Sequence, residues 1–306
     1  MHFAYLISAH TDAPQLKRLI EALHPDAEFF VHIDLKSRLE DFTSLIHQDN
    51  VHFVEKRTDV VWGSIRQVEY QMTLIQSALT FPVKFDRIFF LSGLDYPLWN
   101  CNQITSWMQK HPNEEFISGY QMDTELLPKD QVELYEVARP FVHLCFLSQK
   151  WNQRLSILAR KTKRLLGLRK KRHFTVNGET WHLYKGADWW CVSRNLLLSI
   201  YNVYTTQPEV HEYFKDSFAP SETLPQTIAF NSKEWSSHCI LHKGKYPGLT
   251  TLTPLHRIIY DPIIKVMDES DYDMLMESGK MFARKFLSGK SEALIKKIIE
   301  NHHGNN

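Results

Sequence analysis

Two carboxylates in the second half of the chain lie beside residues that could give them a chemical role. Glu222 follows Pro220 in a turn that opens a predicted helix, and Asp188 stands directly before Trp189 and Trp190. A carboxylate can take the proton of a hydroxyl group while its oxygen attacks, or it can bind sugar hydroxyls beside an aromatic ring. The simpler interpretations are a first-turn carboxylate that favours the helix dipole and two tryptophans that pack in the core.

Two adjacent cations near the end of the chain, Arg284 and Lys285, could balance the charge of a departing phosphate group. Arginine offers a fork for phosphate oxygens and lysine a point charge, which together can perform the task that a metal ion performs elsewhere. The pattern Asp271-Tyr272-Asp273 could instead hold a divalent metal against a diphosphate. Because it precedes a helical pattern, we interpret it as a helix cap and expect no metal site.

The elements that must position these residues alternate between strands and helices in the first hundred residues. Apolar runs predict strands over residues 3–8, 28–33, 51–54 and 87–91, and helical spacing predicts helices over 13–23 and 67–79. Repeated strand–helix units predict an α/β fold with a mostly parallel sheet flanked by helices. Ligands bind at the carboxyl ends of such strands, where His10, Asp34 and Asp95 are found.

The segment 109–176 loses this rhythm and becomes strongly basic. Its cations between 160 and 172 are Arg160, Lys161, Lys163, Arg164, Arg169, Lys170, Lys171 and Arg172. With the leucines among them, they could form an amphipathic helix that contacts anionic lipid or an acidic acceptor. A solvated helix face is the simpler alternative.

Composition excludes several classes of function. The chain has 306 residues, a hydrophobic share of 43% and a net charge of +1, which allow a sizeable core and give no general affinity for nucleic acid. With only 11 glycines it has no G-x-G-x-x-G or Walker pattern, and it also lacks G-x-S-x-G and H-E-x-x-H. The sequence therefore argues against a dinucleotide-binding protein, a P-loop protein, an α/β-hydrolase and a zinc protease.

The cellular compartment is predicted from the first residues of the chain, from the lengths of its apolar runs and from its cysteines. No basic segment followed by an apolar stretch opens the chain, and no apolar run approaches the roughly 20 residues of a membrane span. Its cysteines, which we expect to be reduced, are widely spaced at Cys101, Cys145, Cys191 and Cys239. We expect a cytoplasmic protein that could lie peripherally at the inner face of the membrane.

Seven short motifs, taken together and in order, resemble the core-2/I-branching family of glycosyltransferases, which includes β-1,6-N-acetylglucosaminyltransferases and peptide O-xylosyltransferases. They are Tyr5-Leu6-Ile7-Ser8-Ala9-His10, Val31-His32-Ile33-Asp34-Leu35-Lys36-Ser37, Val60-Val61-Trp62-Gly63-Ser64, Leu91-Ser92-Gly93-Leu94-Asp95-Tyr96-Pro97-Leu98, Gly186-Ala187-Asp188-Trp189-Trp190, Pro220-Ser221-Glu222 with Gln226-Thr227, and Phe282-Ala283-Arg284-Lys285-Phe286. Each motif alone is weak, but their order across residues 5–286 is specific. The segment from about 110 to 175 contains no motif that matches the family.

The resemblance implies a GT-A-like, Rossmann-type fold, a UDP-sugar donor, inversion at the anomeric carbon and no cofactor or metal. It assigns the nucleotide pocket to Ser8, His10, Asp34, Lys36 and Trp62, and the diphosphate to Arg284 and Lys285. From its place after a strand we also expect Asp95 to bind substrate, and from the packing of sugars on aromatic rings we expect the same of Trp189 and Trp190. Glu222 matches the general base of the N-acetylglucosaminyltransferase branch and is our first choice. Asp188 matches the carboxylate favoured in the xylosyltransferase branch, so the assignment of the base stays open.

From this we expect a single domain over 1–306, with a nucleotide-binding half at 1–108, a variable basic insertion at 109–176 and a catalytic, acceptor-binding half at 177–306. The expected reaction transfers N-acetylglucosamine or xylose to a glycan or lipid-linked glycan, in the synthesis of a surface polysaccharide or glycoconjugate. The alternatives are a metal-dependent transferase that uses Asp271 and Asp273, and a glycan-binding protein without catalysis. The chain departs from the family at Ser64, where a second glycine is common, and a further diphosphate arginine has only Arg257 or Lys265 as candidates.

Overall fold

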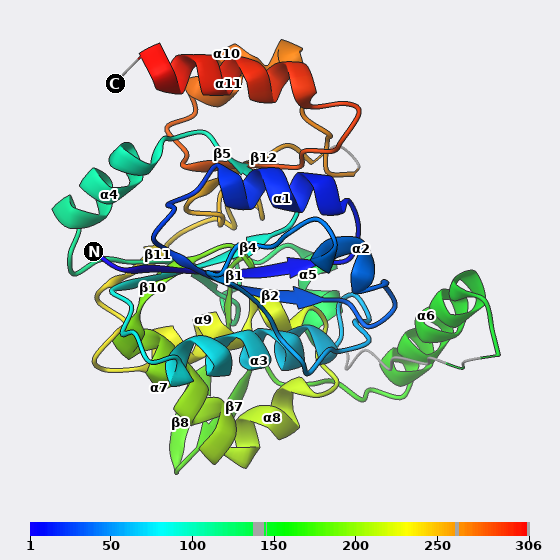
Figure 1. Cartoon of the computed structure of the whole chain (residues 1–306). Coiled ribbons are helices and arrows are strands. Elements are labelled where there is room, and N and C mark those ends of the chain that lie inside the picture. The colour runs from blue at the N-terminus through cyan, green and yellow to red at the C-terminus, as the bar shows by residue number, and fades with distance from the viewer. Residues whose placement is uncertain (137–143, 145, 261–262, 305–306) are drawn as a thin grey trace.

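The central layer of the molecule is a mostly parallel sheet with helices on both faces (Figure 1). The computed structural model describes residues 1–136, 144, 146–260 and 263–304. Its central strands are β1 (Phe3–Ala9), β2 (Glu28–Ile33), β3 (Val51–Phe53), β4 (Arg87–Ser92), β6 (Glu115–Gln121), β9 (Tyr184–Lys185), β10 (Cys191–Ser193) and β11 (Cys239–His242). Within the described residues they form one sheet in the order β11-β6-β10-β4-β1-β2-β3, with β9 paired to β6. β10 and β9 run antiparallel to their neighbours.

Alternation along β1 explains why both faces of this sheet are covered. Ala4 and Leu6 point into one core cluster, and Phe3, Tyr5 and Ile7 point into another. A parallel strand that is apolar on both faces requires helices on both sides, as the near-continuous apolar run predicts. This is the α/β arrangement that the sequence predicted, and it is confirmed.

The helices divide between the two faces of the sheet. They are α1 (Ala13–Glu21), α2 (Glu40–Thr43), α3 (Arg66–Thr80), α4 (Cys101–Lys110), α7 (Arg194–Thr206), α8 (Pro208–Phe214) and α9 (Leu224–Asn231). The helices α1 and α4 cover one face, and α3, α7 and α9 cover the other (Figure 1). A short 3-10 turn, η1 (Pro220–Glu222), leads into α9.

A second, three-stranded sheet lies over α1 and carries the cationic motif. It consists of β5 (Asp95–Pro97), β12 (His256–Ile258) and β13 (Phe282–Arg284), in the order β12-β13-β5. The turn η2 (Glu269–Asp271), α10 (Tyr272–Met276) and α11 (Glu292–Gly304) pack around it. β13 pairs antiparallel with β5, so that Arg284 lies opposite Asp95. Residues almost two hundred positions apart therefore meet beside the end of β4.

The middle of the chain contributes both to the core and to the surface. β6 lies inside the central sheet although it comes from the segment 109–176, in which the sequence showed no strand–helix rhythm. The remaining elements are α5 (Lys129–Glu136), α6 (Gln149–Leu165) and the hairpin of β7 (His173–Val176) and β8 (Glu179–His182). α6 stands out from the body of the molecule (Figure 1). Cys145 lies outside the described residues, and the other three cysteines are free thiols.

The lengths of the helices bear on membrane insertion. Among the helices of the described residues, none combines the length and the apolar character that a membrane crossing requires.

Candidate functional site

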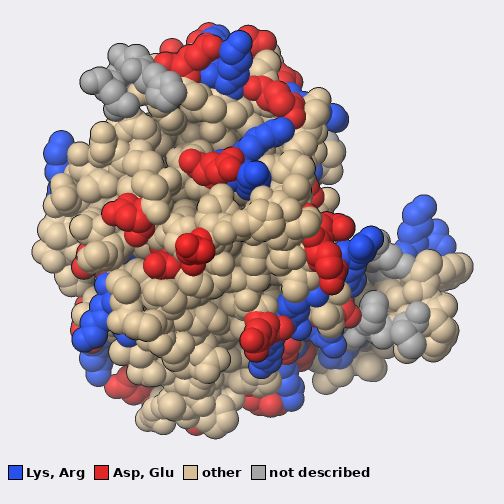
Figure 2. Space-filling view, in the orientation of Figure 1, with Lys and Arg blue, Asp and Glu red and all other residues tan. Residues whose placement is uncertain are grey.

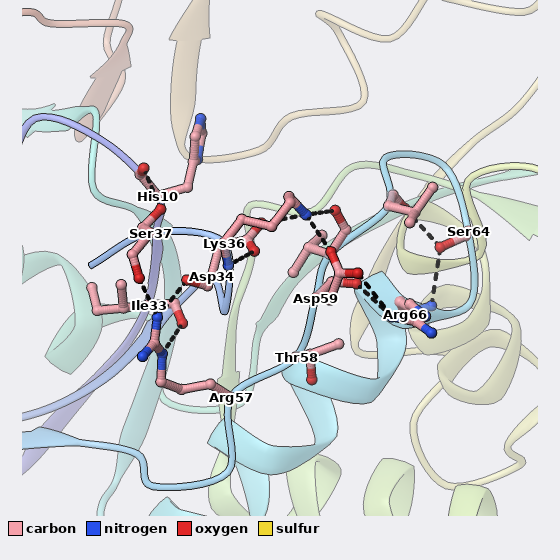
Figure 3. A network of polar contacts seen from close by, with 12 residues as sticks. His10, Ile33, Asp34, Lys36, Ser37, Arg57, Thr58, Asp59, Ser64 and Arg66 are labelled. Carbon is pink, nitrogen blue, oxygen red and sulfur yellow. Dashed lines mark hydrogen bonds and ion pairs between the residues drawn. The ribbon is translucent and has the colours of Figure 1, made fainter. Parts of the chain in front are cut away.

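The loop after β2 forms one wall of the site. Asp34 follows β2, and its backbone N–H donates to the carbonyl of Ala9 at 2.9 Å, which joins the ends of β1 and β2. The Lys36 ammonium lies 3.2 Å from Asp34 Oδ2 and 2.7 Å from Asp59 Oδ1 (Figure 3). Partial burial would lower the pKa of Lys36, but its hydrogen bonds to Asp59 and Asp34 raise it above the usual value. Lys36 is thus a fixed cation at this wall.

A half-buried arginine holds the same loop in place. Arg57 donates to the carbonyl of Ile33 at 3.0 Å, to that of Asp34 at 2.8 Å and to that of Ser37 (Figure 3). Ser37 Oγ in turn donates to the carbonyl of His10 at 2.7 Å. These bonds explain why the motif around Asp34 has a defined shape, although few of its residues belong to a strand.

The electrostatics of His10 show that the predicted nucleotide residues lie together. Its pKa is lowered, first by burial, then by Arg284, and further by Lys36 and Lys285, while Asp34 opposes the shift. These groups come from β1, β2 and β13, which the fold brings to one edge. A neutral imidazole beside three cations suits a site that accepts a polyanion.

Arg284 is aimed by a fully buried carboxylate. Its guanidinium lies 3.0 Å from Asp95 Oδ1 and also donates to Ser92 Oγ. Asp95 is 0% exposed, and its other oxygen accepts from Ser92 N at 2.7 Å and lies 3.2 Å from His256 Nε2. Burial would raise the pKa of Asp95, but His256 and Arg284 hold it below its usual value. The structure therefore places Asp95 beneath the site, as the support of Arg284.

The second wall of the site carries the two carboxylates. Lys185 Nζ lies 2.6 Å from Glu222 Oε2, and Gln71 donates to Asp188 Oδ1 at 3.2 Å. The pKa of Asp188 is raised to about 7, first by burial and then by the negative charge of Glu222; contacts with Ser221, Lys185 and Gln71 partly oppose the shift. Two like charges share one corner, so Asp188 holds its proton close to neutral pH.

A glycine makes this corner possible. A Cβ on Gly186 would lie 2.2 Å from the carbonyl oxygen of Ser118 and 2.8 Å from Gln226 Cγ, so a side chain has no room. The close approach lets Gly186 N donate to the carbonyl of Glu222 at 2.8 Å, while Gln226 donates to the carbonyl of Ala187. The loop after β9 and the turn η1 are thereby locked together, which brings Asp188 beside Glu222.

Tyr70 and Trp189 connect the two walls. The pKa of Tyr70 is raised by burial and by the charge of Asp188, while a hydrogen bond with Ser8 and the charge of Arg284 oppose the shift. The ring of Trp189 lies under the Arg284 guanidinium, with 5.3 Å between ring centroid and Cζ. Asp188 and Arg284 thus both lie close to Tyr70, and Arg284 also contacts Trp189.

The remaining predicted residues lie apart from this centre. Trp190 is 1% exposed and packs on Phe90 in the core, so its ring faces away from solvent. Trp62 is 68% exposed and packs edge-on against Phe218. Its loop contacts the start of the turn η1 through Gly63. The φ of Gly63 is 75°, which suits glycine, and its carbonyl accepts from Ala219 N at 3.0 Å.

The Asp271-Tyr272-Asp273 pattern is a helix cap. Asp271 accepts from Asp268 N at 3.0 Å in a capping box and lies 2.5 Å from Lys265 Nζ. Both oxygens of Asp271 therefore have partners within the protein. In the described part of the chain, no group of three or more His, Cys, Asp or Glu side chains is arranged to hold a metal ion.

Sequence reasoning missed several residues that shape the site: Asp59, Tyr70, Gln71, Lys185, Ser221 and His256. Most belong to helices or loops whose patterns are ordinary. Lys185 is the exception, because it directly precedes the motif of Gly186 to Asp188, and a cation next to a candidate base is a signal that could have been read.

Comparison with known proteins places the chain in one family of enzymes. The model of the Core-2/I-Branching enzyme family matches residues 3–247. Xylosyltransferase 2 of Canis lupus familiaris is 26% identical over 242 residues, covering 76% of this chain and 25% of the relative. A xylosyltransferase of Ciona intestinalis is 21% identical over 239 residues, covering 76% and 25%. The solved structure of mouse xyloside xylosyltransferase 1 covers 78% of this chain and 84% of its own, at 9% identity and a TM-score of 0.34.

The fold and the site thus define an α/β protein with a cluster of polar and charged side chains at the carboxyl ends of its central strands. The chain belongs to the Core-2/I-Branching enzyme family, as its motifs predicted. It spans about a quarter of the length of the xylosyltransferases that it matches.

Proposed function

We propose that this protein transfers a sugar from a UDP-sugar to a hydroxyl group of a glycan, with inversion at the anomeric carbon and without a metal ion. The observation that carries the proposal is that Asp188 and Arg284 both lie close to Tyr70, while Arg284 also lies over Trp189. A base and a leaving-group stabiliser must both reach one donor sugar, and Asp188 and Arg284 could supply these two groups.

In the proposed reaction Asp188 is the general base. Its carboxylate takes the proton of the acceptor hydroxyl while the acceptor oxygen bonds to the anomeric carbon. The bond between that carbon and the diphosphate oxygen breaks, and UDP leaves with the electron pair. Attack from the face opposite the leaving group inverts the configuration.

The surroundings of the two carboxylates favour Asp188 over Glu222, which was our first choice from the sequence. Glu222 is tied to Lys185 at 2.6 Å, so one of its carboxylate oxygens is already engaged by a buried ammonium. The pKa of Asp188, raised to about 7 by burial and by Glu222, lies near the value at which a general base works best in neutral solution. Glu222 then acts by its charge on Asp188.

Arg284 and Lys285 would take the negative charge that develops on the diphosphate. Arg284 is fixed by Asp95 and lies over Trp189, so it needs little rearrangement when UDP departs. Ser8, His10, Asp34 and Lys36 would hold the nucleotide at the ends of β1 and β2.

The relatives suggest the donor to test first. Because the curated matches are named xylosyltransferases, we propose UDP-xylose, with UDP-N-acetylglucosamine second. The acceptor would be a glycan or lipid-linked glycan of a surface polysaccharide or glycoconjugate. A glycan-binding protein without catalysis remains the alternative.

UDP release from a panel of UDP-sugars, with and without EDTA, tests this function without a known acceptor. We expect slow hydrolysis of one donor, unaffected by EDTA and greatly reduced in Asp188→Asn. Release that EDTA abolishes would overturn the metal-free mechanism. The absence of both release and UDP binding would leave the glycan-binding alternative.

A further inference from the structure

The helix α6 presents an apolar stripe to solvent. Trp151, Leu158 and Leu165 follow one another at seven-residue intervals, which places them on one face of the helix. They are 55%, 60% and 87% exposed, respectively. Large apolar side chains aligned on a projecting helix are unusual for a surface that faces only water, and they indicate a partner.

Cations flank this stripe, and the partner must therefore be negatively charged. Lys150, Arg154 and Lys161 are exposed and lie along one border of the stripe. Arg154 also lies over the Trp151 ring, with Cζ 5.0 Å from its centroid. The sequence contains no Asp or Glu between Glu136 and Glu179, so no carboxylate of this segment offsets the positive charge.

The arm that carries α6 is anchored to the body rather than loosely attached. After the helix, Gly167 closes it with a φ of 67°, and Gly167 N donates to the carbonyl of Arg164. Lys170 Nζ lies 2.6 Å from Asp216 Oδ1 and 2.9 Å from Ser217 Oγ, and Arg172 donates to the carbonyl of Met122. Two cations of the basic stretch thus hold the fold together, whereas the cations that border the apolar stripe lie outside this anchor.

The arm lies on the side of the molecule toward which β1 and β2 point (Figure 1). The candidate site lies at the carboxyl ends of these strands. In the same orientation, Lys and Arg gather over the projecting arm (Figure 2). A flat anionic surface touching α6 would therefore lie on the same side as the site.

We propose that α6 binds the surface of an anionic lipid bilayer, with Trp151, Leu158 and Leu165 inserted among the lipids and Lys150, Arg154 and Lys161 on the headgroups. An apolar stripe with tryptophan, bordered by Lys and Arg, is the pattern of helices that lie in the membrane interface. A soluble acidic polymer would use the cations and leave the stripe in water, which makes a bilayer the better match. Binding does not require the proposed transfer reaction, so the two can fail separately.

Co-sedimentation with vesicles tests this proposal. Vesicles of phosphatidylcholine with about a third phosphatidylglycerol are compared with vesicles of phosphatidylcholine alone, at low and at high salt. We expect binding to the anionic vesicles that weakens as salt rises. The triple variant Lys150→Glu, Arg154→Glu, Lys161→Glu should weaken partition roughly a hundredfold or more. The double variant Leu158→Ser, Leu165→Ser should also lose binding.

The matched control reverses three exposed lysines elsewhere, at Lys84, Lys110 and Lys296, and should bind like the unaltered protein. Unaltered donor hydrolysis or UDP binding in solution, with an unaltered melting temperature, shows that each α6 variant is folded. Equal loss in the control, binding that ignores lipid charge, or binding to a soluble polyanion such as polyphosphate but to no vesicle would each overturn the proposal.

Discussion

The two walls of the site differ in how their charges are balanced. On the cationic wall, two of the cations lie on carboxylates: Lys36 lies between Asp34 and Asp59, and Arg284 lies on Asp95. On the carboxylate wall, Asp188 and Glu222 share one corner with Lys185, and Lys185 is paired to Glu222. The carboxylate wall therefore keeps a proton on Asp188 close to neutral pH, whereas the ion pairs of the cationic wall need no such proton.

In the proposed function, this difference separates the residues that bind the donor from the residue that takes the proton. A balanced, buried network such as that of Asp95, Arg284 and His256 keeps its shape over a wide range of pH, which suits the recognition of a nucleotide diphosphate. Asp188 is costly to ionise, first because it is buried and second because Glu222 is close. A group in that position is well suited to take up a proton and release it again.

The largest effect is expected from Asp188→Asn, which keeps the shape of the side chain and removes the base. Loss of a general base typically lowers the rate about a hundredfold to ten-thousandfold. We expect that loss in kcat for donor hydrolysis or transfer, with donor binding little changed. Steady-state kinetics of the variant, beside isothermal titration of UDP, checks the expectation.

The same variant gives a readout of stability with a defined sign. The pKa of Asp188 is raised from 3.8 to about 7 in the folded protein, so the unaltered protein loses stability as pH rises between these values. The amide of the Asp188→Asn variant does not titrate in this range, and the melting temperature of the variant relative to the unaltered protein should therefore rise between pH 4 and pH 8. A constant difference across this range would contradict the raised pKa.

The next effect is expected from Lys285→Ala, which removes from the cationic wall a cation that we propose binds the diphosphate. We expect a loss of roughly tenfold to a thousandfold in kcat/KM, because charge on the departing UDP is less well stabilised. Lys290→Ala, on the same loop and exposed, is the matched control and should keep its activity. If both variants keep full activity, the charge of UDP is balanced elsewhere.

Much of the fold could be predicted from the sequence, because parallel strands buried on both faces leave clear apolar runs. The strand predicted over 28–33 is β2 within the same bounds, and the helix predicted over 67–79 is α3, longer by one residue at each end. β6 was missed. Its place in the sheet depends on β10 and β11, which come from distant parts of the chain, so the local rhythm gave no signal.

Site residues that belong to a recognisable motif could be predicted from the sequence, and those brought to the site by tertiary contacts could not. Asp34, Lys36 and Arg284 all lie close to His10, and their role at a nucleotide stays a prediction. Asp95 and Trp190, by contrast, were expected at the substrate, and the structure places both in the interior. Whether a side chain is exposed cannot be predicted from its residue type. Tyr70 and Gln71 lie at the site only because α3 packs beneath it.

A smaller effect, on pH dependence, is expected from Glu222→Gln. Burial makes the main contribution to the raised pKa of Asp188 and the charge of Glu222 adds to it, so removing that charge should lower the pKa. The acid limb of the pH–rate profile, near pH 7 in the unaltered protein, should then move to lower pH. Profiles of kcat over pH 5 to 9 measure the shift.

Glu179→Gln is the control for this variant. Glu179 lies on the distant hairpin of β7 and β8 and pairs with Lys233. Its profile should match that of the unaltered protein. A uniform loss of a hundredfold or more in Glu222→Gln, with Asp188→Asn still active, would make Glu222 the base and reverse the roles on the carboxylate wall.

The smallest effect is expected from Lys36→Met on the cationic wall. Lys36 is more than half exposed and lies on Asp34 and Asp59, and exposed ion pairs contribute about 0–1 kcal/mol to stability. The loop is also held by Arg57, so the melting temperature should change little. We expect KM for the UDP-sugar to rise several-fold while kcat stays close to that of the unaltered protein, because Lys36 would contact the nucleotide and not the bond that breaks. Lys17→Met, on the exposed side of α1, should leave both constants unchanged. A large fall in kcat would show that Lys36 acts on the leaving group, and that the cationic wall takes part in the chemistry beyond Arg284 and Lys285.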